Sequence, residues 1–312
     1  MKQFVKKIFV FSLPVLIGLA AIFFIKTNRE FCYNYIKGDC DGRGKLLYKK
    51  MYEDNRKVDY LFVGSSKTWN DVNDELVENL INVSGSQVRL FNVGYCRFGR
   101  NLDYLFCKEF LKRNKLKKIF LEVRADESTT SHPIYPYLAN GREVLEGALA
   151  LNSRLFPELY NHLLMNINYT RCNFDFETAE ANTTNPFLHG YNNIEKTISP
   201  DKLDEFYKEE TQNKETINTN SPSYRFSNYY LSKIKKLCDT KNIELVFLYL
   251  PSYANVNKTP AFKSEYEKWG KVIIGPDSIF SNKNYWKDVA HFNSFGADAY
   301  SRFLAGELLR YY

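Results

Sequence analysis

The stretch that decides the fold is a short apolar run that ends in small polar residues, Val58-Asp59-Tyr60-Leu61-Phe62-Val63-Gly64-Ser65-Ser66-Lys67-Thr68. Four consecutive apolar residues are typical of a strand that is buried on both faces, as in a parallel sheet. The glycine and the two serines that follow favour a turn. We therefore expect a buried parallel strand with Ser65 and Ser66 at its carboxyl end.

Strand and helix patterns alternate along the rest of the chain. The expected strands are residues 60–63, 88–93, 118–123, 243–250 and 271–274; the expected helices begin at about Asn73 or span 100–113, 224–240 and the C-terminal end. This alternation predicts an α/β fold, with a three-layer α/β/α arrangement around a parallel, flavodoxin-like sheet.

The alternation is interrupted between about residues 125 and 222. This segment of roughly 100 residues is too long for a plain loop, so we expect an inserted cap or subdomain, with one helix over 142–165. A chain of 312 residues can form one large core. We therefore expect a single α/β domain over 58–312 that carries this insertion.

The first 30 residues predict a membrane anchor. The run from Ile8 to Ile25 is apolar apart from three small or turn-forming residues, and 18 residues are just enough to cross a bilayer. A cleaved signal peptide is the alternative, although the apolar run continues past the small residues where cleavage would occur. The excess of Lys and Arg before the run places the N-terminus in the cytoplasm and the rest of the chain outside it. Residues 31–57 are polar and are expected to be a tether.

Charge and cysteine content exclude some functions. The net charge is +7, but +4 of it lies in residues 1–30, and the +3 on the other 282 residues is too little to suggest a nucleic-acid partner. The six cysteines show no metal-ligand spacing, and we expect neither a metal nor a cofactor. Cys32 and Cys40 are close enough in sequence to form a disulfide in an oxidising compartment.

A carboxylate and an imidazole lie close together near the C-terminus. Asp288 and His291 are three residues apart, so the carboxylate can bind one ring nitrogen while the other takes a proton. Asn293 follows and opens the last helix. Since parallel strands end at one edge of a sheet, we expect this pair at the same edge as Ser66. The segments after the second and third strands, 94–97 and 124–127, belong to that edge too.

These two motifs resemble those of the SGNH (GDSL-like) hydrolase superfamily: Gly64-Ser65-Ser66 after an apolar strand, and Asp288-x-x-His291-x-Asn293 near the C-terminus. The chain is most similar to the membrane-anchored, extracytoplasmic branch that acts on acyl esters of cell-envelope polysaccharides, as in alginate O-acetylation and teichoic acid D-alanylation. The resemblance covers residues 58–312 outside the insertion.

The resemblance implies a role for each motif residue. Ser66 would be the nucleophile, with Ser65 as the alternative. His291 would be the general base, and Asp288 would orient it. The backbone N–H of Ser66 would begin the oxyanion hole.

Two positions depart from the family pattern. The second family block, Asn-x-Gly-x-x-Gly, is matched through Gly94, but Arg97 stands where its last glycine donates to the oxyanion. The third block usually supplies an asparagine, and residues 123–127 contain none. We expect Arg97 or Arg124 to supply the missing positive charge or to favour an anionic substrate. Asp126 is a further substrate candidate, and an ion cluster of Asp126 and Glu127 with Arg124 is an equal alternative.

The resemblance implies a serine esterase or O-acyltransferase on small acyl esters, with acetyl expected, of extracytoplasmic glycans. Its partners would be an acylated carbohydrate or other ester substrate, the membrane through residues 8–25, and a membrane-bound acyl donor; a bacterial source is implied. The alternative is an inactive glycan-binding or assembly protein, in which Ser65 and Ser66 only cap a helix. A lipase-like enzyme acting on the adjacent bilayer is a third hypothesis. Sugar-stacking rings in the insertion would be Tyr135, Tyr137, Phe187 and Tyr191.

Overall fold

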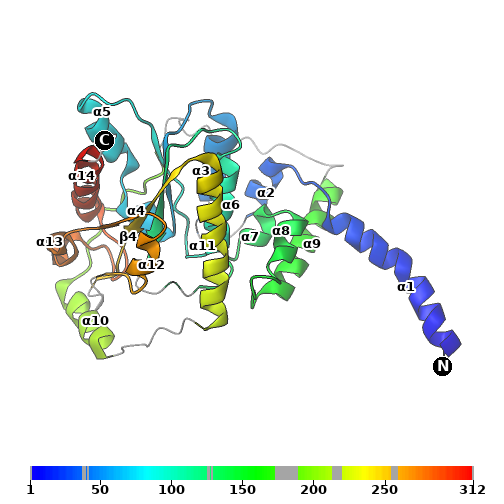
Figure 1. Cartoon of the computed structure of the whole chain (residues 1–312). Coiled ribbons are helices and arrows are strands. Elements are labelled where there is room, and N and C mark those ends of the chain that lie inside the picture. Colours follow the sequence, from blue (N-terminus) through cyan, green and yellow to red (C-terminus); the bar gives the residue numbers. More distant parts are fainter. Residues whose placement is uncertain are drawn as a thin grey trace.

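The computed structural model shows an α/β protein whose N-terminal helix extends away from the rest of the chain (Figure 1). The residues it describes are 2–36, 40, 42–124, 127, 129–172, 189–212, 220–253 and 259–310. The strands are β1 (Tyr60–Val63), β2 (Leu90–Asn92), β3 (Lys118–Val123), β4 (Glu244–Tyr249) and β5 (Lys271–Ile274).

The five strands form one parallel sheet in the order β2-β1-β3-β4-β5. Leu61 of β1 pairs with Phe91 on one side and with Ile119 on the other. The winding direction changes after β2, so the carboxyl ends of the neighbouring strands β1 and β3 flank the point at which a crevice is expected in such sheets. The expected α/β class and parallel sheet are confirmed.

Side chains of the sheet enter two separate hydrophobic clusters. Leu61 and Ile119 belong to one, together with residues of α6 (Arg100–Phe110) and α11 (Pro222–Lys241). Phe62 and Phe120 belong to the other, with residues of α5 (Asp74–Val83) and α14 (Ser294–Arg310). Because neighbouring residues of a strand point to opposite faces, both faces of the sheet are buried, which explains the continuous apolar runs.

Four of the remaining described helices precede the first strand, and the others lie in the segments that follow β1, β3, β4 and β5. They are α1 (Lys2–Phe23), α2 (Arg29–Tyr35), α3 (Arg43–Tyr48), the π-helix η1 (Lys49–Glu53), α4 (Ser66–Asp71), α7 (Tyr135–Leu138), α8 (Gly141–Glu146), α9 (Leu155–Cys172), α10 (Pro200–Gln212), α12 (Lys263–Glu267), α13 (Asp277–Phe280) and the 3-10 helix η2 (Lys283–Tyr285).

Helix α1 is the one described helix that is long and apolar enough to cross a membrane. None of its apolar window, Lys6–Phe23, is buried, and the end of that window contacts α9 through Ile22 and Phe23. The chain after α1 is not the expected polar tether. Residues 29–35 and 43–53 form α2, α3 and η1, and Phe31, Tyr33 and Met51 are buried in the first cluster. The glycines suggested a flexible linker, but aromatic and apolar residues before and after them pack onto the domain.

The disulfide also differs from the expected pairing. Cys40 is bonded to Cys96, which lies in the segment after β2, and not to Cys32. Cys32 is a buried free thiol on α2, with its sulfur 3.1 Å from Thr27 Oγ1. Nearness in sequence was misleading because α2 turns the Cys32 side chain into the core.

The segment between β3 and α11 contains four helices in its described parts, α7 to α10. The single helix expected over 142–165 is two helices, because α8 ends at Glu146 and α9 begins at Leu155. A capping box of Asn140 and Glu143 starts α8. Leu203 of α10 is buried in the second cluster, so this part of the segment packs onto the domain.

Candidate active site

The structure brings Ser66, His291 and Asp288 together at the carboxyl edge of the sheet. His291 Nε2 lies 2.8 Å from Ser66 Oγ. His291 Nδ1 lies 2.9 and 3.0 Å from the two oxygens of Asp288. The imidazole is therefore placed to take the proton of the hydroxyl while the carboxylate accepts a hydrogen bond from the other ring nitrogen.

The turn that carries Ser66 is fixed by a buried carboxylate. Glu122, near the end of β3, accepts hydrogen bonds from the backbone N–H groups of Ser65 (2.7 Å) and Thr68 (3.2 Å) and from both hydroxyls. Ser65 caps α4 by accepting from Lys67 N–H. A Cβ on Gly64 would come within 2.5 Å of Glu122, so the turn requires glycine there.

The alternative nucleophile, Ser65, occupies a different position. Its hydroxyl is fully buried and bonds to Glu122, and it accepts a hydrogen bond of 2.8 Å from Arg124. Ser66, one residue on, is only half-buried and faces His291. The geometry favours Ser66 as the nucleophile and gives Ser65 the part of a helix cap and a contact of Glu122.

The segment with Asp288 and His291 is joined to the end of α4 by a hydrogen bond. Asp71 at the end of α4 accepts a hydrogen bond of 2.8 Å from the backbone N–H of Phe292. Burial would raise the pKa of Asp288, but hydrogen bonds from the His291 ring and from backbone N–H groups of Ala290 and His291 lower that pKa to about 2. Asp288 is thus ionised at neutral pH and can stabilise an imidazolium.

Donors for an oxyanion are fewer than the resemblance implies. No described residue accepts a hydrogen bond from the backbone N–H of Ser66, which leaves that group available. The N–H of Gly94 donates to Asn92 Oδ1 at 2.8 Å instead. Gly94 is required for packing, since a Cβ would lie 2.4 Å from the backbone nitrogen of Trp69. Arg97 has a φ of 63°, a left-handed conformation that favours glycine, at the position where the resembled family has one.

Arg124 is the cation placed beside the nucleophile turn. Its Nε donates to Glu122 at 3.0 Å and its guanidinium stacks over the ring of Phe98. Burial would raise the pKa of Glu122, but Arg124 and the hydrogen bonds from Ser65 and Thr68 bring that pKa down to about 2. Half-exposed beside Ser65, Arg124 can turn its remaining N–H groups toward a substrate.

The other candidate residues lie elsewhere or are not described. Asp126 lies outside the described residues. Asn293 is fully buried and accepts from the N–H of Gly296 while donating to Thr197 and to the Asn284 carbonyl, so it starts α14. Glu127 does not form an ion pair with Arg124 but a buried one with Arg100, which also bonds to Asp103. These contacts are structural.

Three residues of the site were missed in the sequence. Glu122 is a charged residue inside an apolar strand. This position could have indicated a structural or functional role, because a buried carboxylate needs hydrogen-bond or charge partners. Asp71 is fully buried at the end of α4. Lys67 donates to Ser252 Oγ at 2.9 Å, and its burial, followed by the nearby charge of Arg124, lowers its pKa to about 8. Nothing in the local pattern distinguished Asp71 and Lys67 from surface residues.

The rings proposed for sugar stacking are not gathered at this site. Tyr135 is fully buried and donates a hydrogen bond to the Glu143 carbonyl. Tyr137 packs on the first cluster and Tyr191 on the second. Phe187 lies outside the described residues.

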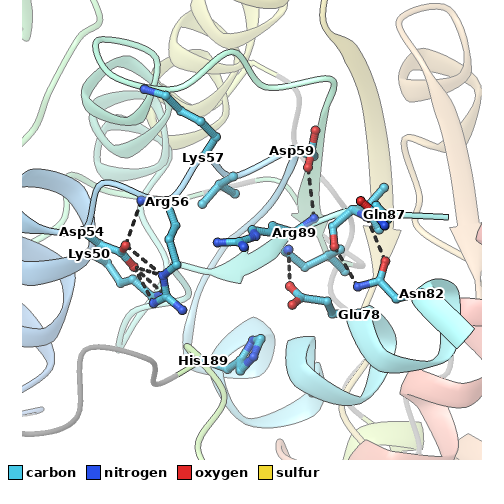
Figure 2. Close-up of a pocket in the computed structure, with 13 residues that line it drawn as sticks. Lys50, Asp54, Arg56, Lys57, Asp59, Glu78, Asn82, Gln87, Arg89 and His189 are labelled. Atoms are coloured by element: carbon cyan, nitrogen blue, oxygen red, sulfur yellow. Dashed lines mark hydrogen bonds and ion pairs between the residues drawn. The ribbon is translucent and has the colours of Figure 1, made fainter.

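A cavity of about 730 Å³ opens at the other end of the sheet (Figure 2). Its walls include Asp59 just before β1 and Arg89 just before β2, so it is remote from the carboxyl edge. Three of its charged side chains are paired with one another: Asp54 binds both Arg56 and Lys50, as the dashed lines in Figure 2 show for Arg56. The candidate active site is separate from this cavity.

Within the described residues, no group of three or more His, Cys, Asp or Glu side chains is arranged to hold a metal ion. Comparison with models of protein families gives no match, and comparison with curated proteins gives none either.

Proposed function

We propose that this chain is a serine esterase or O-acyltransferase of the SGNH type, acting on small acyl esters through an acyl-serine intermediate. The observation that carries the proposal is the contact of 2.8 Å between His291 Nε2 and Ser66 Oγ, with Asp288 on the other ring nitrogen. Residues 225 positions apart in sequence meet there in the order that nucleophile, base and orienting acid require.

The reaction would proceed in two steps. Ser66 Oγ attacks the ester carbonyl as its proton passes to His291 Nε2, and the departing alcohol takes that proton from His291. Water or a sugar hydroxyl then gives its proton to His291 and attacks the acyl carbon, and His291 returns that proton to Ser66 Oγ as the acyl–oxygen bond breaks. The backbone N–H of Ser66 supports the oxyanion, and Arg124 supplies charged N–H donors in place of the absent glycine and asparagine donors.

The fold and location fit this class. The strand order with two buried faces supports a three-layer, flavodoxin-like arrangement, and the segment of about residues 125–222 is proposed as an insertion in it. Helix α1 is proposed as an uncleaved anchor with the domain on the extracytoplasmic side. The disulfide between Cys40 and Cys96 supports an oxidising compartment. An acylated glycan as substrate, acetyl as the acyl group, a membrane-bound acyl donor and a bacterial source are parts of the same proposal.

The test is hydrolysis of p-nitrophenyl acetate by the detergent-solubilised full chain. We expect Ser66→Ala to lower kcat/KM by at least about 10³-fold, whereas Ser84→Ala, at an exposed serine that only bonds back to Ile81 in its own helix turn, should have no effect. Equal rates for the wild type and Ser66→Ala would contradict the proposal.

A second candidate function is a glycan-binding or assembly protein without turnover. One observation favours it: the N–H of Gly94, just after β2, donates to Asn92 Oδ1 and is not available to an oxyanion. In that case Ser66→Ala would leave glycan binding intact, and neither hydrolysis nor acyl transfer to a sugar would be detected in the wild type.

A further inference from the structure

The end of helix α1 is held by side chains of α9. His162 Nε2 lies 3.1 Å from the Phe23 carbonyl, and Asn166 Nδ2 donates to the carbonyls of Ile22 and Phe23 at 3.0 Å each. The rings of Phe23 and His162 also meet edge to face at 4.8 Å. These bonds satisfy the last carbonyls of α1. The end of the candidate membrane helix, where it would leave a bilayer, is therefore bound to α9.

A stripe of exposed apolar side chains lies on the same helix. Phe156, Tyr160 and Leu164 are spaced four residues apart, so they share one face of α9. Phe156 is 82% and Tyr160 62% exposed. Outside α1, six of the eleven exposed large apolar residues of the described chain lie between residues 145 and 164. These six are Leu145, Leu149, Leu151, Phe156, Tyr160 and Leu164.

The stripe faces away from the protein core and lies beside the anchor. At 3.6 residues per turn, it is on the side of α9 opposite the buried Glu158, His162 and Met165, while Asn166 lies between the two sides. In Figure 1, α1 leaves the body next to α8 and α9 and extends outward from them. A bilayer crossed by α1 would therefore pass along this face.

We infer that the α9 stripe, with the turn at Leu149 and Leu151, rests in the interfacial layer of the bilayer that α1 crosses. Aromatic and apolar side chains beside a spanning helix suit the boundary between headgroups and acyl chains. Lys26, just past α1, and Arg171, in the last turn of α9, are both exposed and can meet lipid phosphates. The contact would hold the domain in one orientation on the membrane instead of leaving it to swing on α1.

The inference is tested with an environment-sensitive fluorophore on single cysteines of the full chain, reconstituted in vesicles of phosphatidylcholine and phosphatidylglycerol. The labelled positions are Tyr160→Cys and Leu164→Cys, each in a Cys172→Ser background, because the free cysteines at 32, 107 and 238 are buried. Val83→Cys, at an 88% exposed position on α5, is the matched aqueous control. Leu16→Cys, within α1, reports on the anchor.

We expect lipids with a nitroxide near the headgroup to quench the probes at 160 and 164 at least about twofold more than the probe at 83, and iodide in the buffer to do the reverse. Charge in the stripe, Phe156→Glu with Leu164→Glu, should abolish the lipid quenching at 160. Equal quenching at 160, 164 and 83 would overturn the inference. So would shielding at 160 from both quenchers, the sign of a protein partner or a second copy. The probe at position 16 should be quenched by lipids that carry the nitroxide deeper in the acyl chain. Such quenching shows that α1 has inserted, so that the outcomes at 160 and 164 are not due to a failure of insertion.

Discussion

At the scale of single residues, Glu122 connects the sheet to the nucleophile. Its carboxylate binds the N–H groups and hydroxyls of the turn, so it determines where Ser66 lies without touching the reacting hydroxyl. Arg124 balances its charge at 3.0 Å. The pair places one buried anion and one half-exposed cation directly behind the candidate catalytic serine.

Replacing Glu122 by Gln tests this placement. The pKa of Glu122 is about 2 in the folded chain, below the value of about 4.3 of a free side chain. The carboxylate therefore stabilises the fold fully above about pH 5, and this contribution is lost as the pH falls toward 2. We expect Glu122→Gln to lower the free energy of unfolding by about 3 kcal/mol at pH 7 and by about half as much at pH 3. Urea unfolding of the solubilised full chain at both pH values measures the two differences, and equal differences would refute the charge argument.

Arg124→Ala separates the two arginines that were candidates for the missing donor. Because Arg124 is bonded to Ser65, next to the nucleophile, its loss should lower kcat for a neutral ester by about 10²-fold. Arg97→Ala should lower kcat by less than Arg124→Ala. Steady-state kinetics with p-nitrophenyl acetate give both numbers, and a larger effect of Arg97→Ala would transfer the role to that residue.

At the scale of elements, the turn between β1 and α4 depends on Gly64. A Cβ there would lie 2.2 Å from Thr68 Oγ1 and 2.5 Å from Glu122, inside the network that caps α4. We expect Gly64→Ala to lower the free energy of unfolding by at least about 2 kcal/mol. Gly306→Ala, within α14 where a Cβ meets no other atom within 4 Å, should instead raise it by about 0.5–1 kcal/mol. Thermal unfolding of both variants checks the contrast; a neutral Gly64→Ala would show that the turn adapts.

Elements with a strong local pattern could be predicted from the sequence. The strands at 118–123 and 271–274 and the helix capped by Asn73 lie where apolar spacing and the cap residue indicated. Short helices could not be predicted. Helix α4 has six residues, four of them buried polar ones, so it has no apolar stripe. Its position depends on Glu122, a contact between residues 54 or more positions apart.

The candidate site also contains residues that the sequence could predict and residues that it could not. Ser66, Asp288 and His291 were predicted to meet because the chemistry of a triad restricts the residue types. Asp71 and Lys67 were missed because their roles come from burial and distant partners. The complete burial of Arg100 and the pairing of Cys40 with Cys96 likewise depend on packing between residues far apart in sequence.

At the scale of the whole molecule, the Cys40–Cys96 bond ties the segment after α1 to the segment that follows β2. The closed loop spans 56 residues, so the bond should stabilise the fold by about 2–4 kcal/mol. We expect Cys40→Ala with Cys96→Ala to lower the melting temperature, and a reductant to lower it in the wild type but not in the double variant. Peptide mapping without reductant that found both thiols free would contradict the pairing.

The proposed anchor, the proposed membrane contact of the α9 stripe and the proposed enzymatic function together imply catalysis close to a membrane surface. Chain that packs onto the domain begins soon after α1, since Arg29 of α2 pairs with Glu109 of α6 at 2.6 Å. Little free chain therefore separates the candidate membrane helix from the sheet, and a bilayer crossed by α1 would keep the candidate site close to it.

The most direct test of the central claim is labelling of the full-length protein with a fluorophosphonate, with the modified residue located by mass spectrometry. The account predicts a single adduct on Ser66, slowed by at least about 10²-fold in His291→Ala and absent in Ser66→Ala. Labelling that fails in the folded wild type, or that falls on another residue, would contradict it.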